Sequence, residues 1–517
     1  VLPFRNETGD SPLDPLGRVA ADWIAQGLVR TELVRVVMAE SASAVPAGRS
    51  ALLSGAYSRH GDSLRFSARV EGPDGAVLGG MEATSPPGED PLLAVERLRQ
   101  RFMGLLALRH DPRLAQWAAE TPDPPAYTAY SEHVAGLEKY SEGNHVTAAQ
   151  HYERAAALDT SFLLPRLELA SIYAFLPYQR EDNQKADSLA ELLQRSRARL
   201  PRVQRLHLDA VQAQLQNHPG GVYEAYRRAA EIAPERYGYE FAEAALRVGQ
   251  YQQAVDALRR IEPERAIARN YWWAFASALH LLARHEEELS VARRARPPSF
   301  PRERLRYQAR ALAALGRMDE LNAVLEENAK QAGGEWTSVG WMTWAGDELL
   351  IHGHRELARQ LYERGVAQWQ FAAAERPGLR LAWVPQLYYR AGRLDTARAL
   401  YQRRQTESLG GDSQAPGSPE ALGGLAAVTA RQGHRDEARR IARVLEEQWK
   451  LGDSGRVSAL MSRAKIAALL GEREQAVRLL RQALSEGMPH YSLHFEAVDL
   501  LGLRGYPPFE ALLQAAQ

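Results

Sequence analysis

The sequence predicts a small α/β domain followed by a long all-α solenoid, so that the protein as a whole is mostly helical. Short apolar segments alternate with turn residues over about the first 108 positions, which is typical of strands joined by hairpins. From residue 126 onward, one helical pattern recurs with a fixed spacing. The Pro-rich stretch 121–125 stands between these two regions, and we expect a linker over residues 109–125.

Hairpin turns and two amphipathic helices predict the first domain, residues 1–108. The turns are 60–62 (His-Gly-Asp) and 73–75 (Pro-Asp-Gly), because Gly and Asp tolerate the backbone conformations that tight turns require. Helices are expected at 13–29 and 91–108, each with an apolar stripe that needs a sheet to cover. The expected strands are residues 1–4, 33–37, 51–57, 63–70 and 76–82.

The first domain resembles a known family. Residues 1–28, VLPFRNETGDSPLDPLGRVAADWIAQGL, are similar to the opening of the TolB-like amino-terminal domain, in which a V-L-P-F-x-N-x-(S/T)-G-D motif forms a strand and turn. Residues 52–78, LLSGAYSRHGDSLRFSARVEGPDGAVL, resemble the later hairpin of that domain. The family carries a helix between its second and third strands. Only Met38–Ser50 is available for it here, so we expect that helix to be shortened or lost.

The second region repeats a glycine, an Ala or Leu five residues later, and an aromatic or apolar residue four residues after that. From Gly316 onward these glycines are 37, 39, 41 and 38 residues apart. This period and pattern predict tetratricopeptide-type repeats, each a pair of antiparallel helices that must stack on its neighbours. We expect about ten repeats over 126–490 and a carboxy-terminal cap over 491–517. The turn glycines are Gly143, Gly249, Gly316, Gly353, Gly392, Gly433 and Gly471.

Composition and motifs argue against catalysis and against nucleic acid as a partner. The charges of the 64 basic and 64 acidic residues cancel, so the chain lacks the overall positive field that attracts nucleic acid. No cysteine is present, and we find neither a phosphate-binding loop nor a zinc-protease helix. The pairs His280/His285 and His352/His354 have spacings that do not favour one helical face, and we expect solvated or turn histidines there. We therefore expect no catalytic residue, cofactor or metal ligand.

The combination of a TolB-like domain with tetratricopeptide repeats resembles the carboxy-terminal region of large bacterial regulators. Those carry a serine/threonine protein kinase or a winged-helix domain upstream, often with a membrane span between. The resemblance implies a sensor or scaffold that binds a protein or peptide; the alternative is the accessory tail of such a kinase. The chain opens at Val1 without methionine, and we expect it to be cut from a longer protein. No apolar stretch reaches the roughly 20 residues of a membrane span, and the compartment stays open.

A binding groove is expected on the first helix of each pair, because that helix lines the concave face in this repeat class. Counting back 13, 10, 6 and 3 residues from a turn glycine finds the groove-facing positions. Arginines gather between residues 293 and 310, and seven of the ten tryptophans lie between Trp272 and Trp383. These enrichments favour an acidic or aromatic-bearing segment as ligand. The candidate groove residues are Tyr130, His133, Leu137, Tyr140, Arg236, Tyr239, Arg306, Arg310, Gln386 and Tyr389.

Overall fold

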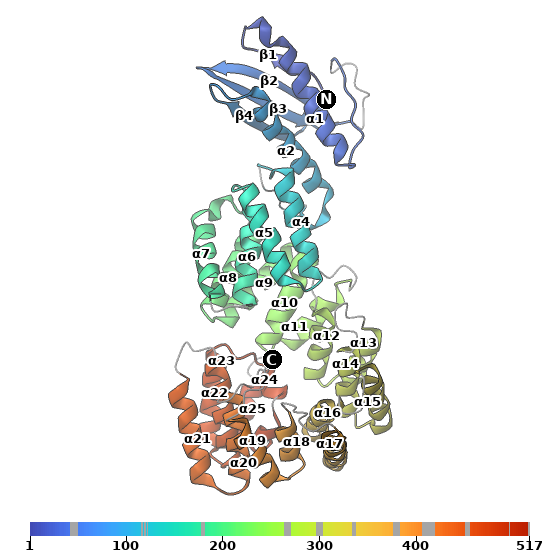
Figure 1. Ribbon diagram of the computed structural model, residues 1–517, viewed down its shortest axis with the longest axis vertical. Coiled ribbons are helices and arrows are strands. Elements are labelled where there is room, and N and C mark those ends of the chain that lie inside the picture. Colours follow the sequence, from blue (N-terminus) through green and yellow to red (C-terminus); the bar gives the residue numbers. More distant parts are fainter. Residues whose placement is uncertain are drawn as a thin grey trace. The chain divides into compact units, whose positions relative to one another are not determined.

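The structure, a computed structural model, consists of a small four-stranded α/β domain followed by a tetratricopeptide-type helical solenoid (Figure 1). It describes residues 1–41, 50–114, 117, 120, 123–176, 181–262, 270–295, 303–332, 338–375, 383–405, 419–449, 455–495 and 497–514. The chain divides into two compact units, residues 1–215 and 216–517. None of the described helices is both long and apolar enough to cross a membrane.

A sheet of order β1-β2-β3-β4 opens the first unit. Strand β1 (Arg5–Asn6) pairs in parallel with β2 (Leu52–His60), while β3 (Ser63–Glu71) and β4 (Val77–Ser85) continue the sheet antiparallel. The helices α1 (Asp14–Arg30) and α2 (Pro91–His110) pack with the sheet in one apolar core. Its fully buried members include Ile24, Tyr57, Phe66, Val95 and Leu98.

Both helices and three of the strands lie where the sequence predicts them, but two details of the sheet differ. The paired residues of the first strand are Arg5–Asn6, just after the expected residues 1–4. The expected strand 33–37 is wrong, since these residues form no strand. Leu33, Val34 and Val37 stay 38–61% exposed, so this segment lacks the burial on one face that normally holds a strand in register. Most of the stretch in which a lost helix was expected, residues 42–49, lies outside the described residues.

The predicted linker 109–125 is packed where the structure describes it. Leu114, Trp117, Pro124 and Pro125 are buried. The carbonyl of Pro125 lies so close to Gly104 of α2 that a Cβ on that glycine would be 1.9 Å from its oxygen. The α/β domain is thus attached to the first repeat by close contact, although the domain boundaries themselves stay a prediction.

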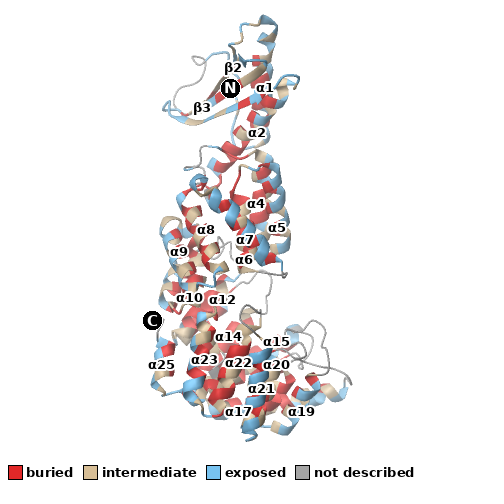
Figure 2. Cartoon of the chain, turned by 90° about the vertical axis from the view of Figure 1, so that its left-hand side faces the viewer, coloured by how far each residue is buried: buried red, intermediate tan, exposed pale blue. Residues whose placement is uncertain are grey.

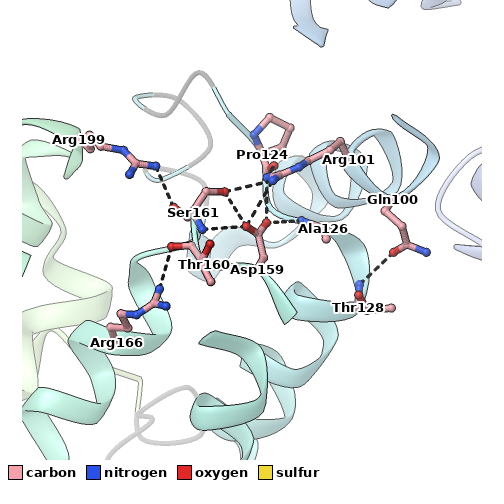
Figure 3. A network of polar contacts seen from close by, with 10 residues as sticks. All are labelled: Gln100, Arg101, Pro124, Ala126, Thr128, Asp159, Thr160, Ser161, Arg166 and Arg199. Atoms are coloured by element: carbon pink, nitrogen blue, oxygen red, sulfur yellow. Dashed lines mark hydrogen bonds and ion pairs between the residues drawn. The ribbon is translucent and has the colours of Figure 1, made fainter. Parts of the chain in front are cut away.

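A polar network reinforces this attachment (Figure 3). Arg101 of α2 donates to the carbonyl of Pro124 and forms an ion pair of 2.9 Å with Asp159, which follows the second helix of the first repeat. The same carboxylate accepts hydrogen bonds from the backbone N–H groups of Ala126 and Ser161, both at 2.9 Å. Asp159 therefore joins three separate segments of the first unit.

Helices fill the rest of both units, and many of them bury one face and expose the other (Figure 2). The first unit continues with α4 (Tyr127–Ser141), α5 (His145–Leu158), α6 (Leu164–Phe175), α7 (Asp182–Arg195) and α8 (Arg202–Leu215). The second unit begins with α9 (Pro219–Ile232), α10 (Pro234–Arg247), α11 (Tyr251–Arg259), α12 (Tyr271–Leu281), α13 (His285–Arg294), α14 (Glu303–Ala314) and α15 (Met318–Ala332). It continues with α16 (Val339–Ile351), α17 (Arg355–Glu375), α18 (Val384–Arg390), α19 (Leu394–Arg404), α20 (Pro419–Arg431), α21 (Arg435–Gln448), α22 (Arg456–Leu469) and α23 (Arg473–Ser485).

The turns inside the helix pairs explain the glycine pattern. All seven predicted turn glycines have φ between +69° and +89°, the left-handed region that favours glycine. After α22, for example, the N–H of Gly471 donates to the carbonyl of Ala468, and the next N–H donates to Ala467. These bonds satisfy carbonyls at the helix end. Ala283 takes the same conformation, with φ of 56°, between α12 and α13, where the sequence shows no glycine.

The last residues form a segment of α24 (Ser492–Phe495), η6 (Ala497–Leu503) and α25 (Pro507–Gln514). We call residues 488–514 the C-terminal segment. Leu493, Leu500, Leu503 and Phe509 bury their side chains in one core with residues of α22 and α23. The segment also reaches other repeats of the second unit: the N–H of His490 donates to the carbonyl of Arg247 at the end of α10. Figure 1 shows α24 in the middle of this unit.

Candidate functional site on the inner surface of the second unit

The first helices of several pairs in the second unit face the C-terminal segment. On α14, the guanidinium of Arg310 lies 5.3 Å from the ring centre of Phe495. On α18, the hydroxyl of Tyr389 donates to Asp499 at 2.9 Å, and Arg390 forms an ion pair of 2.8 Å with the same carboxylate. We call the surface of α12, α14, α16 and α18 that faces this segment the inner surface.

A cavity of about 520 Å³ lies beside the C-terminal segment on the inner surface. Its wall includes Trp344 and Asp347 of α16, Gln386 of α18, Glu420 of α20 and Lys465 of α22. A volume of this size falls in the range of small-ligand and side-chain pockets. The C-terminal segment therefore leaves part of the inner surface open.

Arg390 balances two carboxylates in the wall of the cavity. It forms ion pairs of 2.8 Å with Asp347 and with Asp499, and all three side chains are at most 14% exposed. Burial raises the pKa of Asp347. Burial acts in the same direction on Asp499, but Arg390 outweighs it and keeps the pKa of Asp499 below its usual value. Asp347 and Asp499 thus share one buried cation.

Arg306 differs from Arg293 and Arg310 of its cluster, which both form ion pairs. It is exposed, its guanidinium stacks 5.2 Å from the ring centre of Trp344, and it makes no ion pair with any described residue. Arg310, by contrast, is buried and pairs with Glu288 at 2.6 Å. Arg293 pairs with Glu320 at 2.8 Å, and Arg296 and Arg302 lie outside the described residues. Within the described residues of the cluster, Arg306 and Trp344 together offer an exposed cation on an aromatic platform beside the cavity.

The remaining candidate groove residues are less open to a ligand. His133 is fully buried between the rings of Tyr152 and Phe162. Tyr130 donates to Asp111 at 3.0 Å, and Arg236 pairs with Glu240 at 2.7 Å. The other side chains that are buried or half-buried are Leu137, Tyr140, Tyr239, Gln386 and Tyr389.

Three histidines and two glutamates form a buried polar cluster at the end of α12. His280 Nδ1 lies 2.8 Å from Glu288, and its Nε2 lies 3.3 Å from Glu348. The imidazoles of His285 and His352 are 4.9 and 5.3 Å from that of His280, centre to centre. The expectation of solvated or turn histidines is wrong for His280, which is buried. These five side chains are called the histidine cluster below.

The charges of the histidine cluster follow from burial and from its carboxylates. Burial alone would lower the pKa of His280, but the neighbouring Glu288 and Glu348 raise it to about 9. Although burial opposes it, Arg310 together with His280 holds the pKa of Glu288 far below its usual range. Burial and the charge of His280 lower the pKa of His352 to about 4. Without a bound ion, the two carboxylates therefore lie beside Arg310 and a His280 whose raised pKa favours its protonated form.

Sequence reasoning missed this cluster because it used glycine to locate every turn. Ala283 occupies the turn between α12 and α13, and counting back 3 and 6 residues from it gives His280 and Ser277. Both are buried, and Ser277 accepts a hydrogen bond of 3.1 Å from Arg310. The same rule that selected Arg310 would have found them.

Comparisons with known proteins add little to this geometry. No protein-family model matches the chain, and no curated protein matches it in sequence. Among solved structures, the chain is similar to one of Naa15/Naa10 bound to HypK-THB, at 13% identity and a TM-score of 0.25. That match covers 75% of this chain and 62% of the other. A second similar structure is the P58(IPK) TPR domain, at 14% identity and a TM-score of 0.18, covering 75% of this chain and 89% of the other.

Proposed function

We propose that this chain is a non-catalytic scaffold that binds a protein segment on the inner surface of its second unit. The observation that carries the proposal is the way this surface holds the chain's own C-terminal segment. Groove-facing residues of α14 and α18 contact an aromatic ring, Phe495, and a carboxylate, Asp499. The surface is thus suited to a partner segment that carries aromatic and carboxylate side chains.

Arg306 and Trp344 are the proposed contact point for the partner. Trp344 lines the cavity and Arg306 stacks on its ring, and Arg306 has no carboxylate partner among the described residues. Arginine binds carboxylates through parallel hydrogen bonds, and tryptophan supplies a large apolar contact area. Arg390 pairs with both Asp347 and Asp499 and offsets one of these two negative charges, so the cation that an acidic partner would meet is Arg306.

The first domain supports a regulatory context for this scaffold. Its sheet carries a parallel β1–β2 pair followed by the hairpin strands, and residues 1–28 and 52–78 resemble the TolB-like domain of bacterial regulators. We therefore propose, more specifically, that the chain is the sensor or scaffold region of such a regulator.

A display selection on the full chain tests the proposal. Three peptide libraries of equal length would be used: one rich in acidic and aromatic residues, one rich in basic and aromatic residues, and one neutral. We expect enrichment from the first library and loss of the enriched peptides in the variant Arg306→Ala. Enrichment from the basic library alone would contradict the chemistry, and no enrichment from any library would contradict peptide binding.

A further inference from the structure

We propose that His280, Glu348 and His352 form a binding site for a divalent transition-metal ion of the zinc class. Each residue offers one ligand atom, and the three atoms lie within 4.8 Å of one another. Glu348 Oε2 is 3.3 Å from His280 Nε2 and 3.7 Å from His352 Nε2. Ligands about 2.0–2.1 Å from a tetrahedral zinc ion are themselves about 3.3–3.4 Å apart. Small side-chain movements would therefore bring the three atoms to coordination distance.

The second nitrogen of His280 has the partner that a metal-ligating histidine requires. Its Nδ1 lies 2.8 Å from Glu288 Oε2, and the other oxygen of Glu288 is held by Arg310 at 2.6 Å. Histidine ligands commonly donate their remaining N–H to a carboxylate, which sets the tautomer and the orientation of the ring. Metal binding would displace the proton from Nε2, and the proton kept on Nδ1 would leave the Nε2 lone pair free for the ion beside Glu348.

His352 provides an independent observation. Its Nε2 atom is buried and makes no hydrogen bond within the described part of the chain; its nearest acidic oxygen is that of Glu348 at 3.7 Å. Burying a polar atom without a partner is unfavourable by about 1–3 kcal/mol. A bound ion would satisfy this atom, and two imidazoles with one carboxylate are the donors that zinc accepts.

The site also has a route to solvent. Glu348 lines the cavity on the inner surface, so an ion and a water molecule as fourth ligand could enter there. A second triad, His280, His285 and Glu288, is also compact. Glu288 is already bound by Arg310 and by His280 Nδ1, however, so its oxygens are less available than that of Glu348.

The rival interpretation is an ion-pair network that binds no metal. In that case a protonated His280 bridges Glu288 and Glu348, and Arg310 supplies the second positive charge. Both interpretations use the same contacts, so only a direct metal-binding measurement separates them. The metal site and the proposed function are independent. If the site binds no ion, the inner surface can still bind a partner, and the two experiments can fail separately.

The test is a Co²⁺ titration of the full chain after chelator treatment, followed by visible absorption, with Zn²⁺ added afterwards as competitor. We expect one equivalent of Co²⁺ to give the absorption of a tetrahedral site and Zn²⁺ to abolish it. His352→Gln and Glu348→Gln should each weaken binding by at least about tenfold. The matched control is His354→Gln, because His354 lies on the same turn and its Nε2 faces the carbonyl of Ala314 instead.

Three results would overturn the assignment. The first is the absence of stoichiometric binding by the unmodified chain. The second is unchanged binding in both His352→Gln and Glu348→Gln, with folding verified by circular dichroism. The third is loss of binding in His285→Gln while His352→Gln still binds, which would assign the ion to the other triad. If Glu348→Gln does not fold, the Co²⁺ affinities of His352→Gln and His354→Gln still provide the comparison, because His352 is only half-buried.

Discussion

Tyr389 on α18 donates a hydrogen bond of 2.9 Å to Asp499 in the C-terminal segment, across 110 positions of sequence. The same carboxylate pairs with Arg390. These contacts join the last residues of the chain to a helix pair two repeats before the end of the solenoid. The C-terminal segment is thus more than a cover for α22 and α23: it connects repeats within the second unit.

Asp499→Asn is expected to destabilise the second unit. The change leaves buried Arg390 with Asp347 as its remaining ion-pair partner, and breaking a buried pair costs about 3–5 kcal/mol, so we expect about 3 kcal/mol. Tyr389→Phe removes only the hydroxyl and should cost about 1 kcal/mol. Urea unfolding of both variants measures this. Equal, small losses in the two variants would show that the carboxylate is not the main anchor.

Ala283→Gly is expected to stabilise the protein by about 0.5–1 kcal/mol. Ala283 has φ of 56°, in the left-handed region where a Cβ is unfavourable and glycine is not. The matched reverse change is Gly353→Ala, at φ of 89° with no heavy atom near the added Cβ, which should destabilise by a similar amount. Thermal melts of the two variants should shift in opposite directions, and a shift in the same direction would contradict the role of the turn.

Gly104→Ala is expected to loosen the first domain from the first repeat. The new Cβ would lie 1.9 Å from the carbonyl oxygen of Pro125, so α2 must move, at a cost of about 1–3 kcal/mol. The control is Gly80→Ala on β4, where the nearest atom to the added Cβ is 3.9 Å away. Limited proteolysis should cut the first variant between residues 84 and 126 faster than the control. Equal cutting rates would mean that this contact does not hold the boundary.

Asp159 predicts how the first unit responds to acid. Burial opposes its ionisation, but hydrogen bonds from Ser161 and Ala126 and the charge of Arg101 keep its pKa below the usual value. A lowered folded pKa gives stability that is present above the unfolded value of about 3.9 and is lost as the pH falls through the folded value. The stability advantage over Asp159→Asn should therefore shrink as the pH falls below about 4. An advantage that stays constant down to pH 2 would contradict this.

The sequence predicted the fold well where a structural feature depends only on neighbouring residues. The turn glycines report a backbone conformation, and all seven take it. The hairpin between β2 and β3 follows from the Gly and Asp at its turn. The strand expected at 33–37 failed because three of its four apolar residues stay exposed, and no local pattern reports that.

The candidate site depended on contacts between distant residues, which a single sequence does not show. Counting back from the glycines placed Arg310 and Tyr389 on the inner surface. It did not predict that the C-terminal segment lies against that surface. The histidine cluster joins α12 with a turn 72 residues later, so spacing within one helix could not predict it.

The affinity of an acidic, aromatic peptide for two arginine variants tests the central claim most directly. The peptide is one selected on the full chain, and binding is measured by calorimetry. Arg306→Ala should weaken it by about 1.5–3 kcal/mol, the range for a hydrogen bond to a charged group. Arg293→Ala is the matched control, because that exposed arginine of the same cluster already pairs with Glu320, and it should leave the affinity unchanged. Equal affinities of the two variants would contradict the assignment of the inner surface as the binding site.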